Sequence, residues 1–262
     1  MLIGLCTSAV TGAQKIALSG IDYVEENVQS FLGPEGPEAD FTTRLDAALG
    51  CRRPISVANC FLPGDLKCVG PAVDEARILA YAQQACRRAA RSGVGVIVFG
   101  SGGARSLPPG LSGEAAMGPF CVLLARLGEI ARAQGVVLAL EPLNRGECNF
   151  ITTIAEGVRC VHRVDHPQVR LLVDIFHMLR NDEPPGEILA AKDLVVHAHV
   201  AERDNRRAPG TANEDLRGYL RALHAIGYDR RLSFECGWTD CFIELPNAIA
   251  ALKRQLQESG YP

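Results

Sequence analysis

Short apolar, β-branched runs alternate with stretches of helical spacing along the whole chain of 262 residues. Eight such runs predict strands, at residues 2–6, 21–25, 54–59, 94–99, 136–141, 169–174, 194–200 and 232–235. Continuous apolar runs are typical of parallel strands that are buried on both faces. Because most of the runs precede a helical stretch, the pattern predicts an α/β fold, either a closed barrel or an open doubly wound sheet.

The turns that follow the predicted strands distinguish the two architectures. An open dinucleotide-binding sheet usually carries a glycine-rich phosphate turn after its first strand, but residues 7–12 read Thr-Ser-Ala-Val-Thr-Gly. Residues 100–103 read Gly-Ser-Gly-Gly but lack the third glycine at the required offset, so a flexible loop is expected there rather than a phosphate cradle. Eight strands in a chain of this length predict a single (β/α)8 TIM barrel over residues 1–262.

Three features predict helices between these strands. Leu123, Leu127 and Ile130 recur at i, i+4 and i+7, which gives one helix an apolar face. The last helix is expected to open near Pro246, since proline is favoured in a first helical turn. Between the sixth and seventh strands only residues 183–191 are available, and their prolines restrict the helix there to a short piece.

Composition limits the classes of partner. The apolar content of 47% and charged content of 22% are those of a soluble globular protein with a large core. A net charge of −3 argues against nucleic-acid binding, which requires a basic surface. The chain has no apolar run of the roughly 20 residues that a membrane span needs. The first residues lack a signal peptide and the ten cysteines form no CxxC pair, so a cytoplasmic protein is expected.

Four residues of metal-ligand type close successive predicted strands, namely Glu141, Asp174, His199 and Glu235. They are separated by 33, 25 and 36 residues, each about one βα unit, and the carboxyl ends of barrel strands meet at one mouth. Three carboxylates and an imidazole would be unfavourable together without a cation between them. An oxygen-rich set with one histidine suits Mn²⁺, Co²⁺ or Mg²⁺, so the sequence predicts one divalent metal ion.

Other polar residues occupy the same loops. Glu147, His177 and Arg206 follow the fifth, sixth and seventh strands, and substrate contact is favoured for them over a solvated loop charge. His197 precedes His199 by two residues and so points to the same side of its strand. It is either an alternative ligand or, the favoured interpretation, a hydrogen-bonded core residue.

These residues resemble the xylose-isomerase-like TIM barrels, and within them the ketose 3-epimerases of the tagatose/psicose type, with hydroxypyruvate isomerase nearby. The motifs that carry the resemblance are Glu141-Pro-Leu-Asn-Arg145 with Glu147, Asp174-Ile-Phe-His177-Met178, His197-Ala-His199 with Glu202, Asn205-Arg206-Arg207 before Pro209-Gly210, and Phe234-Glu235. The match is densest between residues 136 and 237. The motifs are far more specific for the superfamily than for a substrate.

The resemblance implies four metal ligands, Glu141, Asp174, His199 and Glu235, and three residues that hold the substrate's oxygens, Glu147, His177 and Arg206. Glu141 and Glu235 would also form the acid/base pair. One extra residue before the Pro-Gly pair means that the arginine match falls on Arg206 or a neighbour. Asn59, Cys60 and Phe99 are weaker candidates from the N-terminal half, and a homodimer or homotetramer is expected.

The implied reaction is proton transfer beside a ketone. A metal ion bound to the ketone oxygen and the neighbouring hydroxyl stabilises the enediolate that forms. Epimerisation needs two bases, one on each face, whereas 1,2-isomerisation needs one, so the two glutamates favour a ketose 3-epimerase over an aldose–ketose isomerase. A metal-dependent lyase or dehydratase stays open. A DNA-repair endonuclease and a non-catalytic barrel are disfavoured, the former because the chain has six histidines and net charge −3. No Lys/Arg cluster marks a phosphate pocket, which favours a free sugar.

Overall fold

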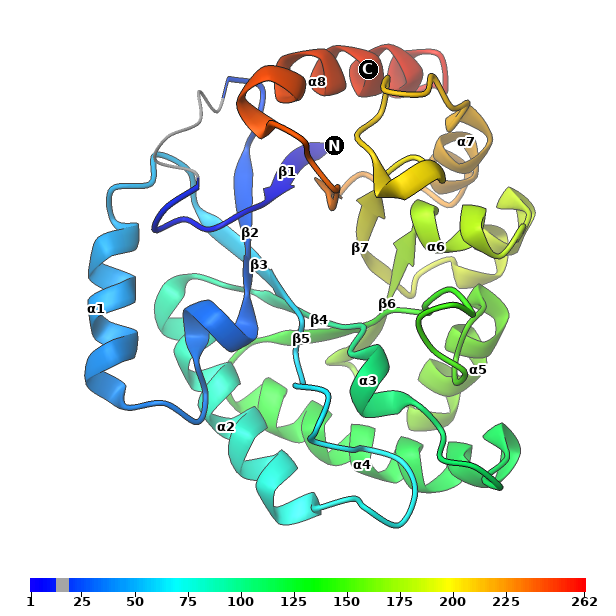
Figure 1. Cartoon of the computed structure of the whole chain (residues 1–262). Helices are drawn as coiled ribbons and strands as arrows, with labels where there is room; N and C mark the ends of the chain where they lie inside the picture. The colour runs from blue at the N-terminus through cyan, green and yellow to red at the C-terminus, as the bar shows by residue number, and fades with distance from the viewer. Residues whose placement is uncertain (13–18) are drawn as a thin grey trace.

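The computed structural model describes residues 1–12 and 19–262, and a closed barrel of parallel strands lies at its centre (Figure 1). The strands are β1 (Leu2–Cys6), β2 (Tyr23–Asn27), β3 (Ile55–Asn59), β4 (Val96–Phe99), β5 (Val137–Leu140), β6 (Val169–Asp174), β7 (Val195–Val200) and β8 (Arg231–Phe234). Each strand pairs with the next in the chain, and β8 closes on β1 with Ile3 opposite Leu232. The predicted TIM barrel is confirmed.

Alternation along the strands divides the apolar core into two parts. In β4, Val96 and Val98 belong to a small cluster with Tyr23, Val57, Ala139 and Leu172. Ile97 and Phe99 face the opposite way and join the larger cluster that includes the helices. Because both faces of the sheet are buried, each strand reads as a continuous apolar run.

The helices surround the barrel (Figure 1). They are α1 (Glu38–Ala48), α2 (Glu75–Ser92), α3 (Gly102–Arg105), α4 (Gly113–Ala133), α5 (Ile154–Val164), α6 (Ile175–Arg180), α7 (Arg217–Ala225) and α8 (Cys241–Gln257), with shorter turns η1 (Val28–Leu32), η2 (Pro185–Ala191) and η3 (Asp204–Arg206). In α4 the predicted apolar face packs inward: Leu123 and Leu127 are buried and Ile130 lies partly buried against the core.

The second strand and the last helix differ from the sequence predictions. Strand β2 runs from Tyr23 to Asn27 rather than over residues 21–25, because the polar residues at its end are buried and pair with β3. The prediction that the last helix opens near Pro246 is wrong. Helix α8 begins at Cys241, where the Asp240 side chain accepts the Phe242 N–H at 2.9 Å, so Pro246 lies one turn further on.

Helix α6 was not expected from the sequence. The predicted short helix at residues 183–191 is present as η2, a 3₁₀ helix, but α6 precedes it directly after β6. Asp174 caps α6, since its Oδ1 accepts the Phe176 N–H at 2.7 Å. This cap turns the chain at the barrel mouth and places His177 there.

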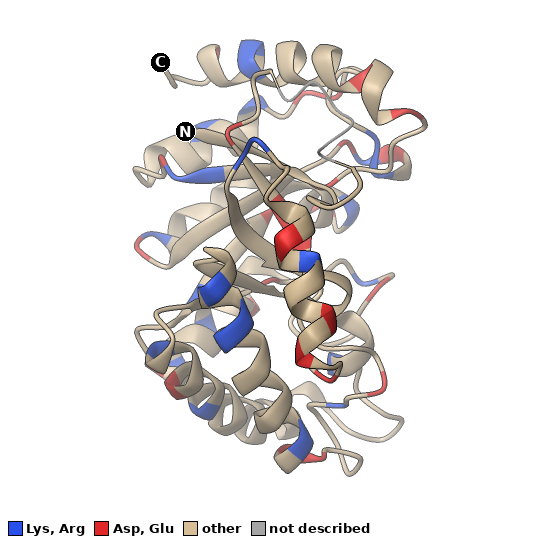
Figure 2. Cartoon of the chain, turned by 90° about the vertical axis from the view of Figure 1, so that its left-hand side faces the viewer, with Lys and Arg blue, Asp and Glu red and all other residues tan. Residues whose placement is uncertain are grey.

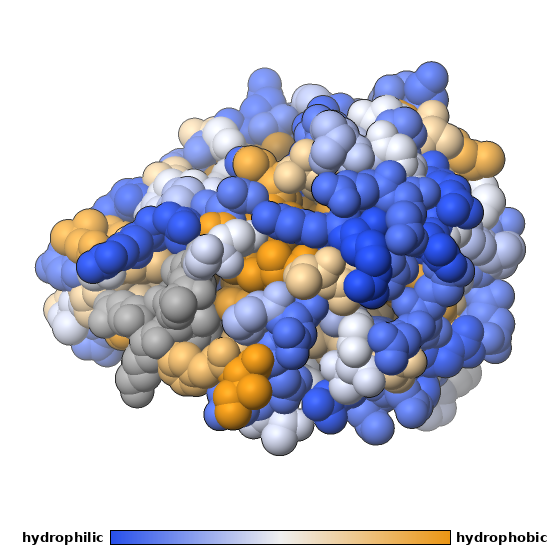
Figure 3. All heavy atoms as spheres, turned by 90° about the horizontal axis from the view of Figure 1, so that it is seen from above, coloured by the Kyte–Doolittle hydropathy of each residue, from blue (hydrophilic) through white to orange (hydrophobic). Residues whose placement is uncertain are grey.

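The surface carries charges of both signs. On the face that shows α1 and α2, basic and acidic residues lie interspersed along the ribbon (Figure 2). Hydrophilic residues cover much of the face that carries α8 (Figure 3). Among the described residues, no helix is both long and apolar enough to cross a membrane. All ten cysteines are free thiols.

Replacement of Leu127 by alanine tests the packing of α4. The side chain is 0% exposed, so Leu127→Ala should lower the free energy of unfolding by about 2–5 kcal/mol through lost burial and the cavity left behind. Val122 lies on the same helix and is 65% exposed, so Val122→Ala should cost about 0.5 kcal/mol or less. Urea denaturation of both variants measures the difference, and equal losses would contradict the assigned faces.

Candidate metal centre

The carboxyl ends of β5 to β8 bring four side chains together at the barrel mouth. One donor atom each from Glu141, Asp174, His199 and Glu235 lies within 4.8 Å of the others. His199 Nδ1 is 3.0 Å from Glu235 Oε2, 3.2 Å from Glu141 Oε1 and 4.0 Å from Asp174 Oδ2. Adjacent ligands of an octahedral ion with bonds of about 2.1 Å lie about 3 Å apart, and opposite ones about 4 Å apart. The spacing and the donor types therefore fit one divalent cation.

The strands position these candidate ligands through backbone hydrogen bonds. Glu141 follows β5 and donates its N–H to Phe99 O at 3.2 Å, and Glu235 follows β8 and donates to Val200 O at 3.3 Å. Asp174 is the last residue of β6, and its two carboxylate oxygens have different partners: Oδ1 caps α6, whereas Oδ2 faces the cluster. All of these backbones belong to the rigid barrel, so the donors are held in place before any ion binds.

The environments of Glu141 and Glu235 push their pKa values in opposite directions. Burial raises the pKa of the Glu141 carboxyl above its ordinary value, although the neighbouring His199 opposes this effect. Burial also acts to raise the pKa of Glu235, but His199 and Arg206 outweigh it and hold that pKa at about 2. Two carboxyls with separated pKa values can serve as a proton donor and a proton acceptor in the same site.

Arg206 covers one side of the four-residue cluster. Its Nη2 lies 3.2 Å from Asp174 Oδ2 and also bonds the Glu235 carboxylate, while its Nε donates to Glu235 O at 3.0 Å. The guanidinium stacks over the Phe176 ring, 4.6 Å from the centroid. Arg206 is thus fixed over the ligands and presents its outer edge to the cavity.

His177 and Glu147 complete the rim. His177 Nδ1 accepts the Asn144 N–H at 3.2 Å, so its Nε2 faces Asp174 Oδ2 at 3.4 Å and Glu141 Oε1 at 3.8 Å. Glu147 accepts from the Asn144 side chain at 2.8 Å, and its own side chain is half-exposed. Asn144 therefore orients both residues, a function that its position in a loop motif does not indicate.

A cavity of about 300 Å³ opens above the cluster. The residues that line it include Gln29, Asn59, Cys60, Ser101, Glu141, Glu147, His177, Arg206 and Glu235. Asn59 Nδ2 donates to Glu235 Oε1 at 3.0 Å, so two of the weaker N-terminal candidates, Asn59 and Cys60, do reach the site. The third, Phe99, does not line this cavity. It is buried against Phe61 and Phe120 because its side chain points away from the barrel interior.

The glycine-rich segment 100–103 forms one wall of the cavity and leads into α3. Arg105, which is fully buried, ties this segment to the ligand strand by donating from Nε to Gly100 O at 2.6 Å and from Nη2 to Glu141 O at 2.7 Å. Glycine at position 100 leaves room for the Glu141 carboxylate, because a Cβ there would lie 2.3 Å from Glu141 Oε2. A side chain at this position would therefore displace the Glu141 carboxylate from the cluster.

A second polar layer lies beneath the cluster. Glu25, on β2, sits 2.8 Å from His199 Nε2 and 2.8 Å from His197 Nε2, and it accepts from Ser233 Oγ at 2.6 Å. His197 is fully buried in this layer and is not part of the four-residue cluster. Burial acts to raise the pKa of Glu25, but His199 and His197 hold it well below its ordinary range.

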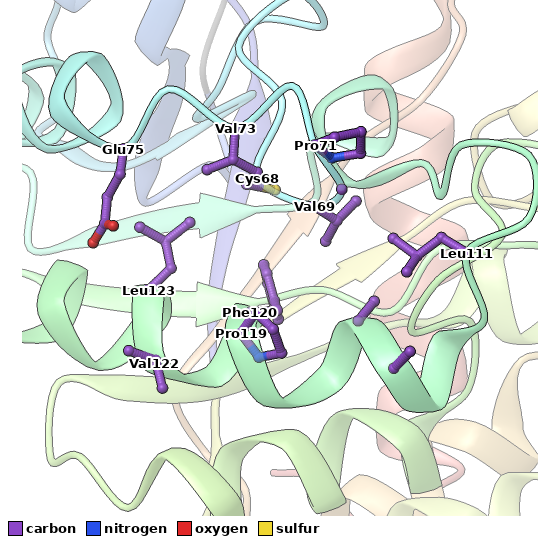
Figure 4. A pocket seen from close by; sticks show the side chains of 13 residues that line it. Cys68, Val69, Pro71, Val73, Glu75, Leu111, Pro119, Phe120, Val122 and Leu123 are labelled. Carbon is purple, nitrogen blue, oxygen red and sulfur yellow. The ribbon is translucent and has the colours of Figure 1, made fainter.

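A larger cavity of about 510 Å³ lies outside the barrel, between residues 68–73 and α4. Figure 4 shows mainly apolar side chains around this space, among them Val73, Phe120 and Leu123. Its one charged lining residue, Glu75, pairs with Arg126. Among the described residues of this lining there is no histidine and no second carboxylate, so the barrel mouth is the candidate site.

The sequence model of the xylose isomerase-like TIM barrel family matches residues 13–258. The chain belongs to this family. It is 36% identical over 113 residues to the L-ribulose 3-epimerase of Mesorhizobium japonicum, and 37% identical over 110 residues to the D-psicose 3-epimerase of Ruminiclostridium cellulolyticum. These alignments cover 43% and 42% of this chain but only 38% and 37% of the two relatives.

Solved structures share the fold over the full barrel. The 3-keto-D-glucoside 4-epimerase of Escherichia coli superposes on this chain with a TM-score of 0.80, and the superposition covers 97% of this chain and 99% of the epimerase chain. Its sequence identity is 21%, so this likeness concerns the fold alone.

Replacement of Gly100 by alanine tests the geometry of the cluster. The new Cβ would force the flexible end of Glu141 to move while the backbone stays in place, so Gly100→Ala should fold normally but bind Mn²⁺ more weakly. Gly95 offers a matched control because a Cβ there would meet nothing within 4 Å. Titration calorimetry with Mn²⁺ checks both variants, and unchanged affinity in Gly100→Ala would contradict the ligand assignment of Glu141.

Proposed function

We propose that the protein is a divalent-metal-dependent ketose 3-epimerase that acts on a free sugar. The observation that carries the proposal is that two carboxylates, Glu141 and Glu235, approach the same histidine nitrogen from two different strands. They reach His199 Nδ1 from β5 and β8 at 3.2 and 3.0 Å. The two curated relatives named above are both ketose 3-epimerases, which supports this choice of reaction.

In the proposed mechanism, the two glutamates move one proton from one face of the sugar to the other. A ketose carries its carbonyl at C2, which acidifies the hydrogen on C3. Glu235 is ionised and takes this proton, while Glu141 delivers a proton to the opposite face and so inverts C3. The roles exchange in the reverse direction, and no atom is gained or lost.

The metal ligands of the proposal are Glu141, Asp174, His199 and Glu235. A bound Mn²⁺, Co²⁺ or Mg²⁺ would supply a Lewis acid that stabilises negative charge on the carbonyl oxygen. Asp174 has no further acid/base role in the proposal, since one of its oxygens caps α6 and the other pairs with Arg206. The proposal therefore assigns the proton transfers to Glu141 and Glu235.

The substrate's hydroxyls are assigned to Glu147, His177 and Arg206. All three line the cavity, and among the described residues of that lining Arg206 is the one arginine or lysine. Its guanidinium is already paired with Asp174 and Glu235. A sugar phosphate would therefore lack a cationic partner, which supports a free ketose. The proposed assembly is a homodimer or homotetramer in the cytoplasm, and light scattering measures its size.

Products from a panel of free ketoses distinguish the alternatives. Epimerisation keeps the mass and the ketone, isomerisation keeps the mass but yields an aldose, and a dehydratase product has lost water. Proton NMR in D₂O should show deuterium at C3 of both epimers, because the abstracted proton exchanges with solvent. An aldose product, or a product lighter than the substrate by one water molecule, would refute the 3-epimerase proposal.

Removal of either glutamate should nearly abolish turnover. We expect Glu141→Gln and Glu235→Gln each to lower kcat by on the order of 10²–10⁴-fold or more while the fold persists, since an amide cannot exchange the proton. Glu187 lies in η2, is partly exposed and does not line the cavity, so it provides a control, and Glu187→Gln should leave kcat unchanged. Near-normal rates in either site variant would eliminate the two-base mechanism.

Removal of the metal ion should also lower the rate of epimerisation. Treatment with a chelator is expected to abolish epimerisation, and addition of Mn²⁺ or Co²⁺ should restore it, because the carboxylate-rich cluster selects such cations. The assay is product formation before and after readdition. Full activity in protein shown to be metal-free by elemental analysis would contradict the proposal.

A further inference from the structure

Glu25 contacts the metal-site histidine from the side opposite the other ligands. It is 1% exposed, and its Oε1 lies 2.8 Å from His199 Nε2. The other ring nitrogen, Nδ1, faces Glu141 and Glu235. A neutral imidazole has one N–H donor and one bare acceptor, so the hydrogen bond on one side decides what the other side can bind.

A second histidine constrains which oxygen of Glu25 is available. His197 Nε2 lies 2.8 Å from Glu25 Oε2, whereas His197 Nδ1 is buried with no hydrogen-bond partner among the described residues. A proton on that Nδ1 would be a buried donor left unsatisfied, so His197 keeps its proton on Nε2 and donates it to Glu25. Ser233 donates to the same oxygen at 2.6 Å, and Tyr23 OH lies 2.7 Å from Ser233 Oγ.

We propose that Glu25 is a positioning residue of the metal centre. It accepts the Nε2 proton of His199 and thereby fixes the ring tautomer and orientation in which Nδ1 is bare and directed at the cation. A carboxylate that orients a ligating histidine in this way is a recurrent feature of metal sites, and its loss typically weakens metal binding. The inference rests on the proposed metal site but assigns a role to a residue outside the ligand set.

Glu25→Gln is the most specific substitution, because it keeps the shape of the side chain and replaces one acceptor oxygen by an NH₂ donor. If the amide NH₂ faces His197, that ring must place its proton on the unpartnered Nδ1, which is unfavourable. If the NH₂ faces His199, that ring must carry its proton on Nδ1, where the cation would bind. Only the carboxylate satisfies both histidines at once.

The experiment is Mn²⁺ titration calorimetry on the 262-residue chain without substrate. Glu25→Gln should weaken Mn²⁺ binding by about 10- to 100-fold. Glu26 is the matched control: it is the adjacent glutamate on β2, also buried, but it accepts from the backbone N–H groups of Ala9 and Asn27 rather than from a histidine. Glu26→Gln should bind Mn²⁺ like the wild type. Wild-type affinity in a folded Glu25→Gln protein would overturn the inference.

Nitrogen-15 NMR of the wild type gives an independent readout if Glu25→Gln does not fold. In protein saturated with diamagnetic Mg²⁺, His199 should carry its proton on Nε2 alone. A proton on Nδ1, with Nε2 bare, would refute the positioning role. A wild type whose Mn²⁺ affinity depends on Glu25 but which epimerises no ketose would support this inference and refute the proposed function alone.

Discussion

Repulsion among buried carboxylates at one end of the barrel is the constraint on which the rest of this structure depends. Glu25, Glu141 and Asp174 are nearly or fully buried, and Glu235 lies beside them. Arg206 supplies one fixed positive charge to this group, which leaves an excess of negative charge in a poorly solvated place. A divalent cation at the point where the donor atoms converge would remove that excess.

The barrel makes such an arrangement tolerable because it fixes the ligands through backbone hydrogen bonds rather than through their own attraction. Glu141 and Glu235 extend the ladders of β5 and β8, and Asp174 is held by capping α6. Stability comes from the apolar layers on both sides of the sheet, so the mouth is free to carry groups that disfavour folding. The same separation leaves the loops that carry Glu147, His177 and Arg206 to line the cavity above the cluster.

The sequence was sufficient for features that repeat at the βα period. Eight apolar runs predicted the barrel, and the ligand-type residues at the ends of four of them predicted the cluster that the structure brings together. The sequence pattern is less informative about where a helix begins, because an N-terminal capping residue and a proline can each mark the first turn. Asp240 caps α8 and makes the helix begin before Pro246. Asp174 caps α6, which is only six residues long and therefore too short to show a helical apolar period in the sequence.

Glu25 shows why the remaining part of the site could not be predicted. Its histidine partners are 172 and 174 residues away in the chain, and Glu25 itself is simply the last residue of the predicted strand 21–25. A single acidic residue in such a run carries no information about which distant groups it meets. Arg105 is comparable, because its partners are backbone carbonyls that any sequence would supply.

The most direct test of the central claim is an anomalous difference map from crystals grown with Mn²⁺. One strong peak is expected at the barrel mouth, within bonding distance of Glu141, Asp174, Glu235 and the Nδ1 atom of His199. Saturating Mn²⁺ that left no density at this point, or density bound elsewhere in the molecule, would contradict the account of the site.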